Sequence, residues 1–518
     1  MTRPIAARIL ALAAIVGIAA QALLLDSLLG INVPILTAAV LAAAWLLRSP
    51  ERPIDPLDRW IPPSTMALAV AVAIRADPFL LLLDVVTACS MLGASVAAIG
   101  GEAVTRRSAA RIVELGFIVL GWAGIGILRV TAALGRRLPT SGATPPTRDL
   151  PPWAIPVARG LVLAIPVLFV FAALFAAADV AFDRLMNTLF TWDVDLGQLP
   201  FRLAIAFLVA WAVAGLLAVA AGGLRDADEA STATPDPTVA PLPQSLGAAA
   251  AVDPLVRPLR LGAIEAATIL IAVDVLFGVF VLVQLTYLFG GQSSLEITGV
   301  PYSQYARSGF FELVWVALLA GGLLTIIHAI AEQRTVALVG SGLALAGLTG
   351  AVLVSALIRL RIYQEAYGWT ELRFYVLATI VWLAIGIGIT MVLLARDRMR
   401  WLVHGLTIAA LVVLAGVNVV GPARLIADEN VARVLNPALV PPDGQTGLDI
   451  GYAVELGDDA IPALVRVLPA IPAIDRPYLL SMLRERARSL ATAEATGWPS
   501  WNLGRDRARE ALKNLPDR

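Results

Sequence analysis

The chain has 518 residues, of which 58% are hydrophobic and only 15% are charged. Soluble domains carry about a quarter charged residues, so this composition indicates a membrane protein with the lipid bilayer as its main partner. The 39 basic residues balance the 39 acidic ones, which leaves no global field for binding nucleic acid. One cysteine and two histidines exclude a disulfide framework and argue against a metal or redox cofactor.

Long apolar segments recur along the chain, and a helix needs about 20 apolar residues to cross a bilayer. No stretch alternates with the period of a strand, so helices are the expected form. The segments lie at residues 7–28, 31–47, 79–99, 112–134, 156–178, 201–223, 261–289, 310–331, 336–358, 372–395 and 401–420, with a shorter twelfth at 62–75. The sequence therefore predicts an all-α, polytopic transmembrane bundle of 11–12 helices.

Two regions interrupt this pattern. One stretch, 224–258, is rich in Ala, Pro, Thr and Asp without apolar periodicity, which is typical of a flexible linker. After residue 420 the hydrophobicity falls, and Leu479, Met482 and Leu483 recur at helical spacing beside charged residues. We therefore divide the chain into N-terminal membrane helices (1–223), the linker (224–258), C-terminal membrane helices (259–420) and a small soluble helical tail (421–518).

Arginines in short loops predict the orientation, because such loops stay in the cytoplasm. Arg136 and the group Arg396, Arg398 and Arg400 mark two cytoplasmic loops, and alternation then puts the tail outside. The early arginines conflict with this assignment if every segment crosses. Leaving out 62–75 gives a model of 11 helices with the N-terminus inside and the tail outside.

Ionisable residues within the apolar segments are expensive in lipid and mark candidate sites. Asp274 lies in the middle of 261–289, where an aspartate costs about 3 kcal/mol. Glu265 falls on the opposite helix face, so the partner of Asp274 comes from another helix, either as a buried ion pair or within a proton or cation site. Asp84 and Glu114 lie near segment ends, where a carboxylate reaches headgroup water or favours a helix N-terminus.

Two polar, aromatic loops precede and follow the segments at 310–331 and 336–358, and alternation puts both on the outer face. Their tyrosines and Trp369 suit an interfacial aromatic belt. Alternatively, the two loops form one outer polar cluster able to hold a carboxylate, a phosphate or the chain's own tail. The candidate residues of this outer cluster are Arg307, Glu312, Arg359, Arg361, Glu365 and Arg373.

No catalytic motif is found: the chain has no phosphate loop in a strand-to-helix context, no HExxH and no GxSxG. The leading hypothesis is a non-enzymatic membrane scaffold or sensor-like protein whose outer loops hold the tail. The alternative is a secondary transporter of a small anion or lipid-like substrate, with Asp274 as its coupling carboxylate. A transporter requires a water-accessible cavity at Asp274, whereas a scaffold buries this residue.

Several quoted stretches resemble a known family: "QLTYLFGG", "YSQYARSGFFELV", "SALIRLRIYQEAYGWTELR", "GLDIGYAVELGDDAIPAL" and "WNLGRDRAREAL". They are similar to a bacterial family of multi-spanning membrane proteins catalogued as a domain of unknown function, numbered in the four-thousand-one-hundreds. The resemblance covers about residues 156–515 and implies a plasma-membrane protein to which the tail belongs, without supplying an activity. The resemblance marks nine positions as features of the family's pattern: Arg307, Gly309, Glu312, Arg359, Tyr363, Gly368, Arg373, Asn502 and Arg505.

Overall fold

A computed structural model gives the arrangement of the helices. It describes residues 3–25, 27–106, 119, 199–221, 263–289, 310–331, 334–442, 444, 447–494, 497–513 and 515–516. The regular elements of these residues are α-helices and short 3₁₀ turns, which confirms the predicted all-α fold. Five of the described helices are long and apolar enough to cross a membrane, so the chain is a membrane protein.

The first group of helices is the N-terminal bundle, with α1 (Arg3–Leu24), α2 (Asn32–Leu47), α3 (Ile61–Ile74), α4 (Pro78–Ile99) and α8 (Leu199–Ala220). Small residues allow the close packing of α1 on α8. Gly17 lies so near Ala210 that an added Cβ atom would meet its Cβ at 2.6 Å. Helices in lipid associate through such close backbone approach because lipid removes the hydrophobic drive between them.

The second group is the C-terminal bundle, with α10 (Ala263–Phe289), α13 (Phe310–Ile330), α14 (Val336–Tyr367), α15 (Glu371–Ala395) and α16 (Leu402–Val420). At 1.5 Å per residue, the 32 residues of α14 extend over about 48 Å. That length exceeds the roughly 30 Å of bilayer hydrocarbon, so α14 places its polar last turns beyond the apolar layer.

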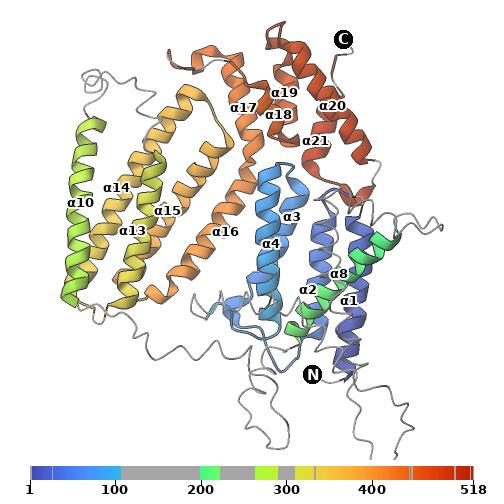
Figure 1. Cartoon of the computed structure of the whole chain (residues 1–518), viewed down its shortest axis with the longest axis horizontal. Helices are drawn as coiled ribbons and strands as arrows, with labels where there is room; N and C mark the ends of the chain where they lie inside the picture. The colour runs from blue at the N-terminus through green and yellow to red at the C-terminus, as the bar shows by residue number, and fades with distance from the viewer. Residues whose placement is uncertain are drawn as a thin grey trace, which may run out of the picture.

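The tail domain lies over the ends of α1 to α4 and beside the upper end of α16 (Figure 1). It contains α17 (Pro422–Leu435), α18 (Ile450–Glu455), α19 (Ile461–Val467), α20 (Arg476–Glu494) and α21 (Leu503–Leu512). The 3₁₀ turns among the described residues are η1 (Pro56–Asp58), η3 (Met399–Trp401), η4 (Pro437–Leu439), η5 (Asp458–Ala460), η6 (Leu468–Ala470) and η7 (Trp498–Ser500).

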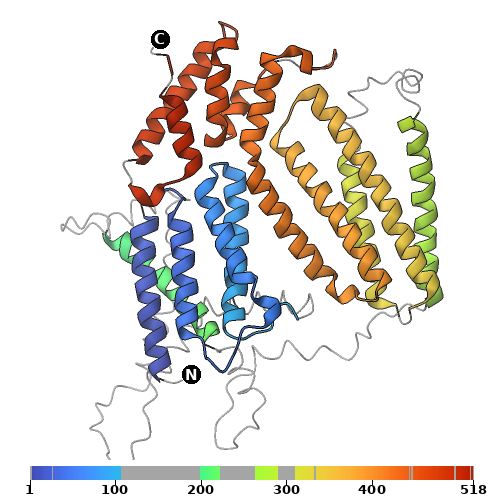
Figure 2. The same cartoon turned by 180° about the vertical axis from the view of Figure 1, so that it is seen from behind.

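One apolar core is shared by the tail domain and the membrane helices below it. Ile426 and Leu464 of the tail belong to the same buried cluster as Leu80 of α4 and Leu414 of α16. The middle of the C-terminal bundle has a separate cluster that includes Leu353 and Ile380. The tail domain is therefore packed as part of the fold, and both views show it above the N-terminal bundle and beside the adjoining edge of the C-terminal bundle (Figure 2).

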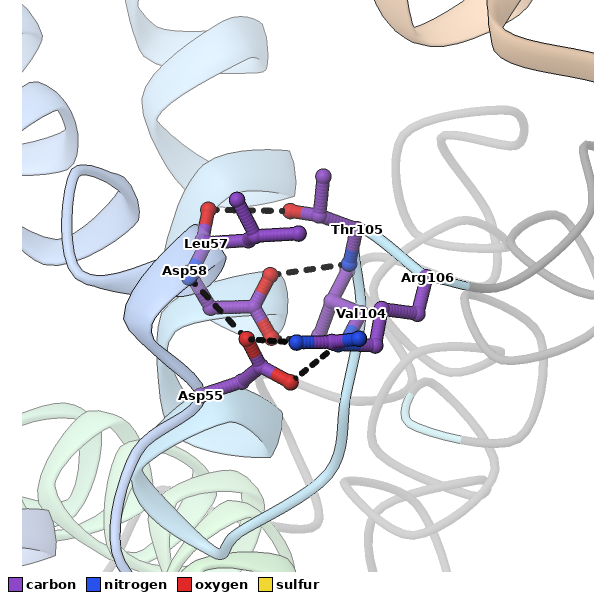
Figure 3. Close-up of polar contacts among 6 residues, drawn as sticks. All are labelled: Asp55, Leu57, Asp58, Val104, Thr105 and Arg106. Carbon is purple, nitrogen blue, oxygen red and sulfur yellow. Dashed lines mark hydrogen bonds and ion pairs between the residues drawn. The ribbon is translucent and has the colours of Figure 1, made fainter.

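The opposite end of the N-terminal bundle is closed by a contact between two loops (Figure 3). The buried Asp58 carboxylate accepts hydrogen bonds from the backbone N–H groups of Val104 and Thr105, both at 2.8 Å. Nearby, Arg106 Nε donates to Asp55 Oδ2 at 2.6 Å. The loops after α2 and after α4 therefore meet at the end of the bundle that is remote from the tail.

This contact fixes the start of the short segment 62–75 at the end of the bundle remote from the tail. The segment forms α3, which packs against α4 and leads from the loop of Asp58 to Arg75 beside the tail. The segment 62–75 therefore runs from one end of the N-terminal bundle to the other, which argues against leaving it out of the membrane topology. Two further predicted segments, 112–134 and 156–178, and the linker at 224–258 lie outside the described residues.

Candidate functional site

The candidate site is the surface on which the tail domain rests, and we name it the tail dock. It consists of three loops between membrane helices: 28–31 after α1, 75–77 after α3 and 365–371 at the corner between α14 and α15. The backbone groups at a helix end lack partners within the helix. The tail supplies many of these missing partners, as follows.

Arg505 of α21 binds the first loop. The Nη2 atom donates to the carbonyl oxygen of Leu29 and to that of Ser500, both at 2.6 Å. The side chain is only 5% exposed, and burial lowers the pKa of the guanidinium. A buried cation is tolerated only where it is paired or hydrogen-bonded, so these carbonyl groups hold α21 against the loop.

Two further hydrogen bonds join the ends of the chain at this loop. The backbone N–H of Leu28 donates to Ser500 Oγ at 3.0 Å. The backbone N–H of Ile31 donates to the carbonyl oxygen of Trp501 at 2.9 Å. The backbone N–H groups that precede α2 therefore find their hydrogen-bond acceptors in η7 and in the residue after it.

Asn502 connects the tail to the end of α3. Its side chain is fully buried, and Nδ2 donates to the carbonyl oxygens of Val72 at 2.9 Å and Arg75 at 2.7 Å. Its Oδ1 accepts from the backbone N–H of Arg505 at 3.1 Å, which caps the N-terminus of α21. One amide side chain thus satisfies the ends of two helices from different domains.

Two charged residues, one in the second loop and one in the tail, form further hydrogen bonds there. Arg75 donates from Nε to the carbonyl oxygen of Asn418 at 2.5 Å and from Nη2 to that of Val419 at 2.6 Å. These carbonyls end α16, where the helix dipole favours a cation. Asp459 of the tail accepts from the backbone N–H of Ala76 at 3.0 Å, and burial raises the pKa of its carboxyl.

The third loop receives Asn430 and Arg433 of α17. The Asn430 side chain accepts a hydrogen bond from the backbone N–H of Trp369 at 2.8 Å and donates one to the carbonyl oxygen of Trp369 at 2.9 Å. Arg433 donates to the carbonyl oxygens of Glu365 at 2.6 Å and Ala366 at 3.0 Å. These last carbonyls of α14 carry the negative end of the helix dipole, so a buried arginine stabilises them.

Gly368 and Tyr452 show how closely this corner fits the tail. Gly368 has φ of +77°, and an added Cβ atom would lie 2.6 Å from Asn430 Oδ1. The Tyr452 hydroxyl oxygen accepts from the backbone N–H of Glu371 at 2.7 Å. Burial is the main reason why the pKa of Tyr452 rises to about 12, so the phenol stays protonated.

Below the tail dock, the two bundles touch at a junction formed by Phe79, Asp84, Tyr375 and Asn418. Asn418 Nδ2 donates to Asp84 Oδ1 at 2.8 Å, and the rings of Phe79 and Tyr375 meet edge to face at 4.6 Å. The expectation that Asp84 reaches headgroup water is wrong, because its side chain is fully buried. Its Oδ2 atom has no hydrogen-bond partner among the described residues.

Asp274 lies in the middle of α10, as the sequence predicts. It is partly exposed, and its Oδ1 atom is buried without a hydrogen-bond partner in the described part of the chain. The expected arginine partner is not found among those residues. An apolar groove of about 550 Å³ between α10 and α13 is lined by Val273 and Phe277, which flank Asp274, and Asp274 itself is not part of its lining.

Four residues of the predicted outer cluster lie at the α14–α15 corner. The Arg373 guanidinium stacks on the Tyr363 ring at 4.1 Å and donates to the carbonyl oxygen of Gly368 at 2.5 Å. Arg361 lies over Trp369 at 5.9 Å. Arg359 and Glu365 occupy the same final turns of α14. Glu312 lies in the first turn of α13, and Arg307 falls outside the described residues.

The contacts between this corner and the tail differ from those that the sequence predicted. In these hydrogen bonds the corner contributes mainly backbone groups, and the tail contributes the side chains. Sequence reasoning missed Asn430 and Arg433, because an asparagine or arginine on a soluble helix is ordinary in composition. Gly368, Asn502 and Arg505 were marked only by the family resemblance. Among the described residues, no group of three or more His, Cys, Asp or Glu side chains is placed to hold a metal ion.

Comparison with known proteins identifies the family without an activity. The model of the domain of unknown function DUF4153 matches residues 64–467, which is more than half of the 518-residue chain. This range begins within α3, ends with α19, and leaves out α21 with Asn502 and Arg505. No curated protein and no solved structure matches the chain. The chain therefore belongs to the DUF4153 family.

Proposed function

We propose that this chain is a non-enzymatic membrane scaffold or sensor-like protein, in which the tail domain clamps the two helix bundles together. The observation that carries the proposal is the capping of helices from both bundles by one domain outside the membrane. Asn502 satisfies carbonyls of the α3 end in the N-terminal bundle. Arg433 satisfies those of α14 in the C-terminal bundle.

The energetics support a clamp. Each hydrogen bond to a charged group contributes about 1.5–3 kcal/mol, and an unsatisfied buried partner costs about 1–3 kcal/mol. A molecule or protein that prefers the free tail would uncap α3 and α14 together, and its differential affinity would shift the arrangement of the bundles. Binding events at the tail are thereby coupled to the membrane helices.

The proposal includes an orientation. The end of the bundles remote from the tail carries the basic residues of the short loops: Arg48, Arg52, Arg59, Arg106, Arg334, Arg396, Arg398 and Arg400. The short loops at the tail dock carry Arg75 alone among their described residues. The bias of Lys and Arg toward cytoplasmic loops supports a multi-pass protein of the bacterial plasma membrane with its tail outside.

Spin-label distances test the clamp. In a Cys89→Ser background, labels at Val86→Cys on α4 and Val412→Cys on α16 report on the two bundles, and both positions are exposed. The pair Asn430→Ala and Arg433→Ala should broaden or shift the distance distribution. The control pair Ser481→Ala and Thr492→Ala removes hydrogen bonds within α20. An unchanged distribution in the first pair would overturn the clamp.

Labelling from outside the cell tests the orientation. Ser489→Cys on α20 should react with a membrane-impermeant maleimide in intact cells, and Arg398→Cys should react only after the cells are opened. The Cys89→Ser background prevents labelling of the native cysteine, which is exposed. The reverse pattern would place the tail in the cytoplasm and contradict the proposed orientation.

A second candidate function, secondary transport of a small anion or lipid-like substrate, is favoured by one observation. The junction holds a buried carboxylate oxygen, Oδ2 of Asp84, without a described partner. In proteoliposomes with an internal pH dye, a transporter should show gradient-driven proton movement that Asp84→Asn abolishes. Asp274→Asn serves as the comparison for the site predicted from sequence. Absence of proton movement in the wild type would end this candidate.

A further inference from the structure

A groove lies between α14 and α15, on the membrane side of the corner where the tail docks. Its volume is about 670 Å³. Ile358 and Ile362 of α14 and Ile380 and Ala384 of α15 contribute to its apolar lining. Both helices are among those long and apolar enough to cross a membrane. An acyl chain is the natural content of an apolar groove at this depth, because lipid is the surrounding solvent.

The groove has a polar end formed by Arg361 and Glu365 of α14. Both side chains are exposed, and neither forms an ion pair with a described residue. The residues are four apart and therefore share one helix face. Because α14 runs toward the tail, Glu365 lies about 6 Å farther from the bilayer centre than Arg361.

The order along this face matches the chemistry of one lipid class. From the bilayer centre outward, the groove offers apolar side chains, then a guanidinium, then a carboxylate. Phosphatidylethanolamine offers acyl chains, then a phosphate, then a primary ammonium. Guanidinium groups pair with phosphate through two parallel hydrogen bonds, and a carboxylate accepts hydrogen bonds from an ammonium group.

We propose that the α14–α15 groove is a binding site for phosphatidylethanolamine. One acyl chain lies between the two helices, Arg361 pairs with the phosphate, and Glu365 accepts hydrogen bonds from the ammonium group. The Trp369 ring faces the guanidinium at 5.9 Å, which limits the positions that Arg361 adopts. Phosphatidylcholine has no N–H donor for Glu365, and phosphatidylglycerol has no cation at all.

Native mass spectrometry of the whole chain in lipid-free detergent tests the site. The protein is titrated separately with phosphatidylethanolamine, phosphatidylcholine and phosphatidylglycerol of identical acyl chains. We expect phosphatidylethanolamine to bind about fivefold more tightly than the other two, which corresponds to one charge-assisted contact at a partly exposed site. Equal binding of the three lipids would overturn the proposal.

Substitutions separate the parts of the site. Arg361→Ala should weaken all three lipids, whereas Glu365→Gln should remove only the preference for phosphatidylethanolamine. Ala384→Trp fills the apolar end and should weaken all lipids. Ile385→Trp, at the neighbouring exposed position outside the groove lining, and Arg484→Ala in the tail should leave binding unchanged.

Two results would show that the groove does not bind lipid. If Ala384→Trp leaves lipid binding intact, the lipids are held elsewhere and the proposal fails. If the same substitution abolishes a dimer without changing lipid binding, the groove belongs to an interface between copies of the chain. Both readouts are independent of the proposed clamp, because Arg361, Glu365 and Ala384 provide no side-chain hydrogen bond to the tail among the described contacts.

Discussion

Asn430 and Trp369 are joined by two hydrogen bonds, because the side-chain amide of Asn430 pairs with both the N–H and the carbonyl group of Trp369, at 2.8 and 2.9 Å. Trp369 is 5% exposed, so water cannot replace this partner. A single side chain of the tail therefore satisfies the backbone at the turn between α14 and α15.

Replacing Asn430 should release the tail from this corner. Asn430→Ala leaves a buried N–H and a buried carbonyl unpaired, which costs about 1–3 kcal/mol for each unsatisfied group. We expect a lower unfolding temperature in detergent and faster trypsin cleavage after residue 420. Ser481→Ala, which removes an exposed hydrogen bond within the tail, should change neither. Wild-type cleavage kinetics for Asn430→Ala would show that the corner does not hold the tail.

Gly368 should tolerate no side chain. Gly368→Ala places an alanine at φ of +77° and a Cβ atom 2.6 Å from Asn430 Oδ1. With ψ of −175°, this residue lies in a backbone region that is essentially restricted to glycine, so the alanine costs about 1–3 kcal/mol, and the displaced asparagine adds its lost hydrogen bonds. Gly388→Ala is the matched control, because Gly388 lies within α15 with open space at its Cβ position. Thermal unfolding should show a loss for the first variant and a gain of up to about 1 kcal/mol for the second.

Asp459 should make the docked tail less stable as pH rises. Burial is the largest influence and raises the pKa of Asp459 above the ordinary 3.8, although the hydrogen bond from the Ala76 N–H and the charge of Arg75 partly oppose the rise. The folded state thus binds a proton more tightly than the unfolded state, so stability falls as pH increases from about 4 through the raised pKa. Asp77 shifts in the same direction because it is also buried.

The variant Asp459→Asn isolates this effect. An asparagine oxygen can still accept the hydrogen bond from the Ala76 N–H, and the buried charge is removed. Unfolding temperatures of the variant and the wild type should differ little at pH 4, and the variant should be the more stable protein at pH 8. If the wild type gains stability over the variant as pH rises, the assigned sign is wrong.

Asp58 and Asp55 provide a matched pair at the opposite end of the N-terminal bundle. Asp58→Asn leaves one of two backbone N–H groups facing an amide NH₂ group, so we expect a loss of about 1–3 kcal/mol. Asp55→Asn weakens the pairing with Arg106, whose side chain is 60% exposed, and should have little effect because water screens the pair. Equal losses of unfolding temperature for the two variants would contradict this ranking.

The sequence predicted the membrane helices well, for a physical reason. A hydrocarbon solvent requires about 20 apolar residues for each crossing, and this requirement is visible in composition alone. The segment 401–420 corresponds to α16 (Leu402–Val420), and 372–395 corresponds to α15 (Glu371–Ala395). The segment 62–75 was ambiguous because α3 has only 14 residues and derives its place from packing on α4.

The tail dock was only partly predictable. Arginines and aromatic residues marked the α14–α15 corner, since such clusters are rare beside apolar helices. The partners of that corner were invisible, because a backbone carbonyl acceptor has no sequence signature. Asn418 meets Asp84 across a separation of 334 residues, and no local pattern reports a contact of that range. The position of Asp84 near the start of α4 was predicted, but its burial against Asn418 was not.

The hydrogen bond between Leu28 and Ser500 joins positions separated by 472 residues. A ribosome delivers the chain from its N-terminus, so the first hairpin of helices enters the bilayer long before its partner is synthesised. During that interval the N–H group of Leu28 must depend on water. Formation of the tail dock should consequently be the last step of assembly. A chain truncated before η7 should insert its membrane helices but cannot form this hydrogen bond.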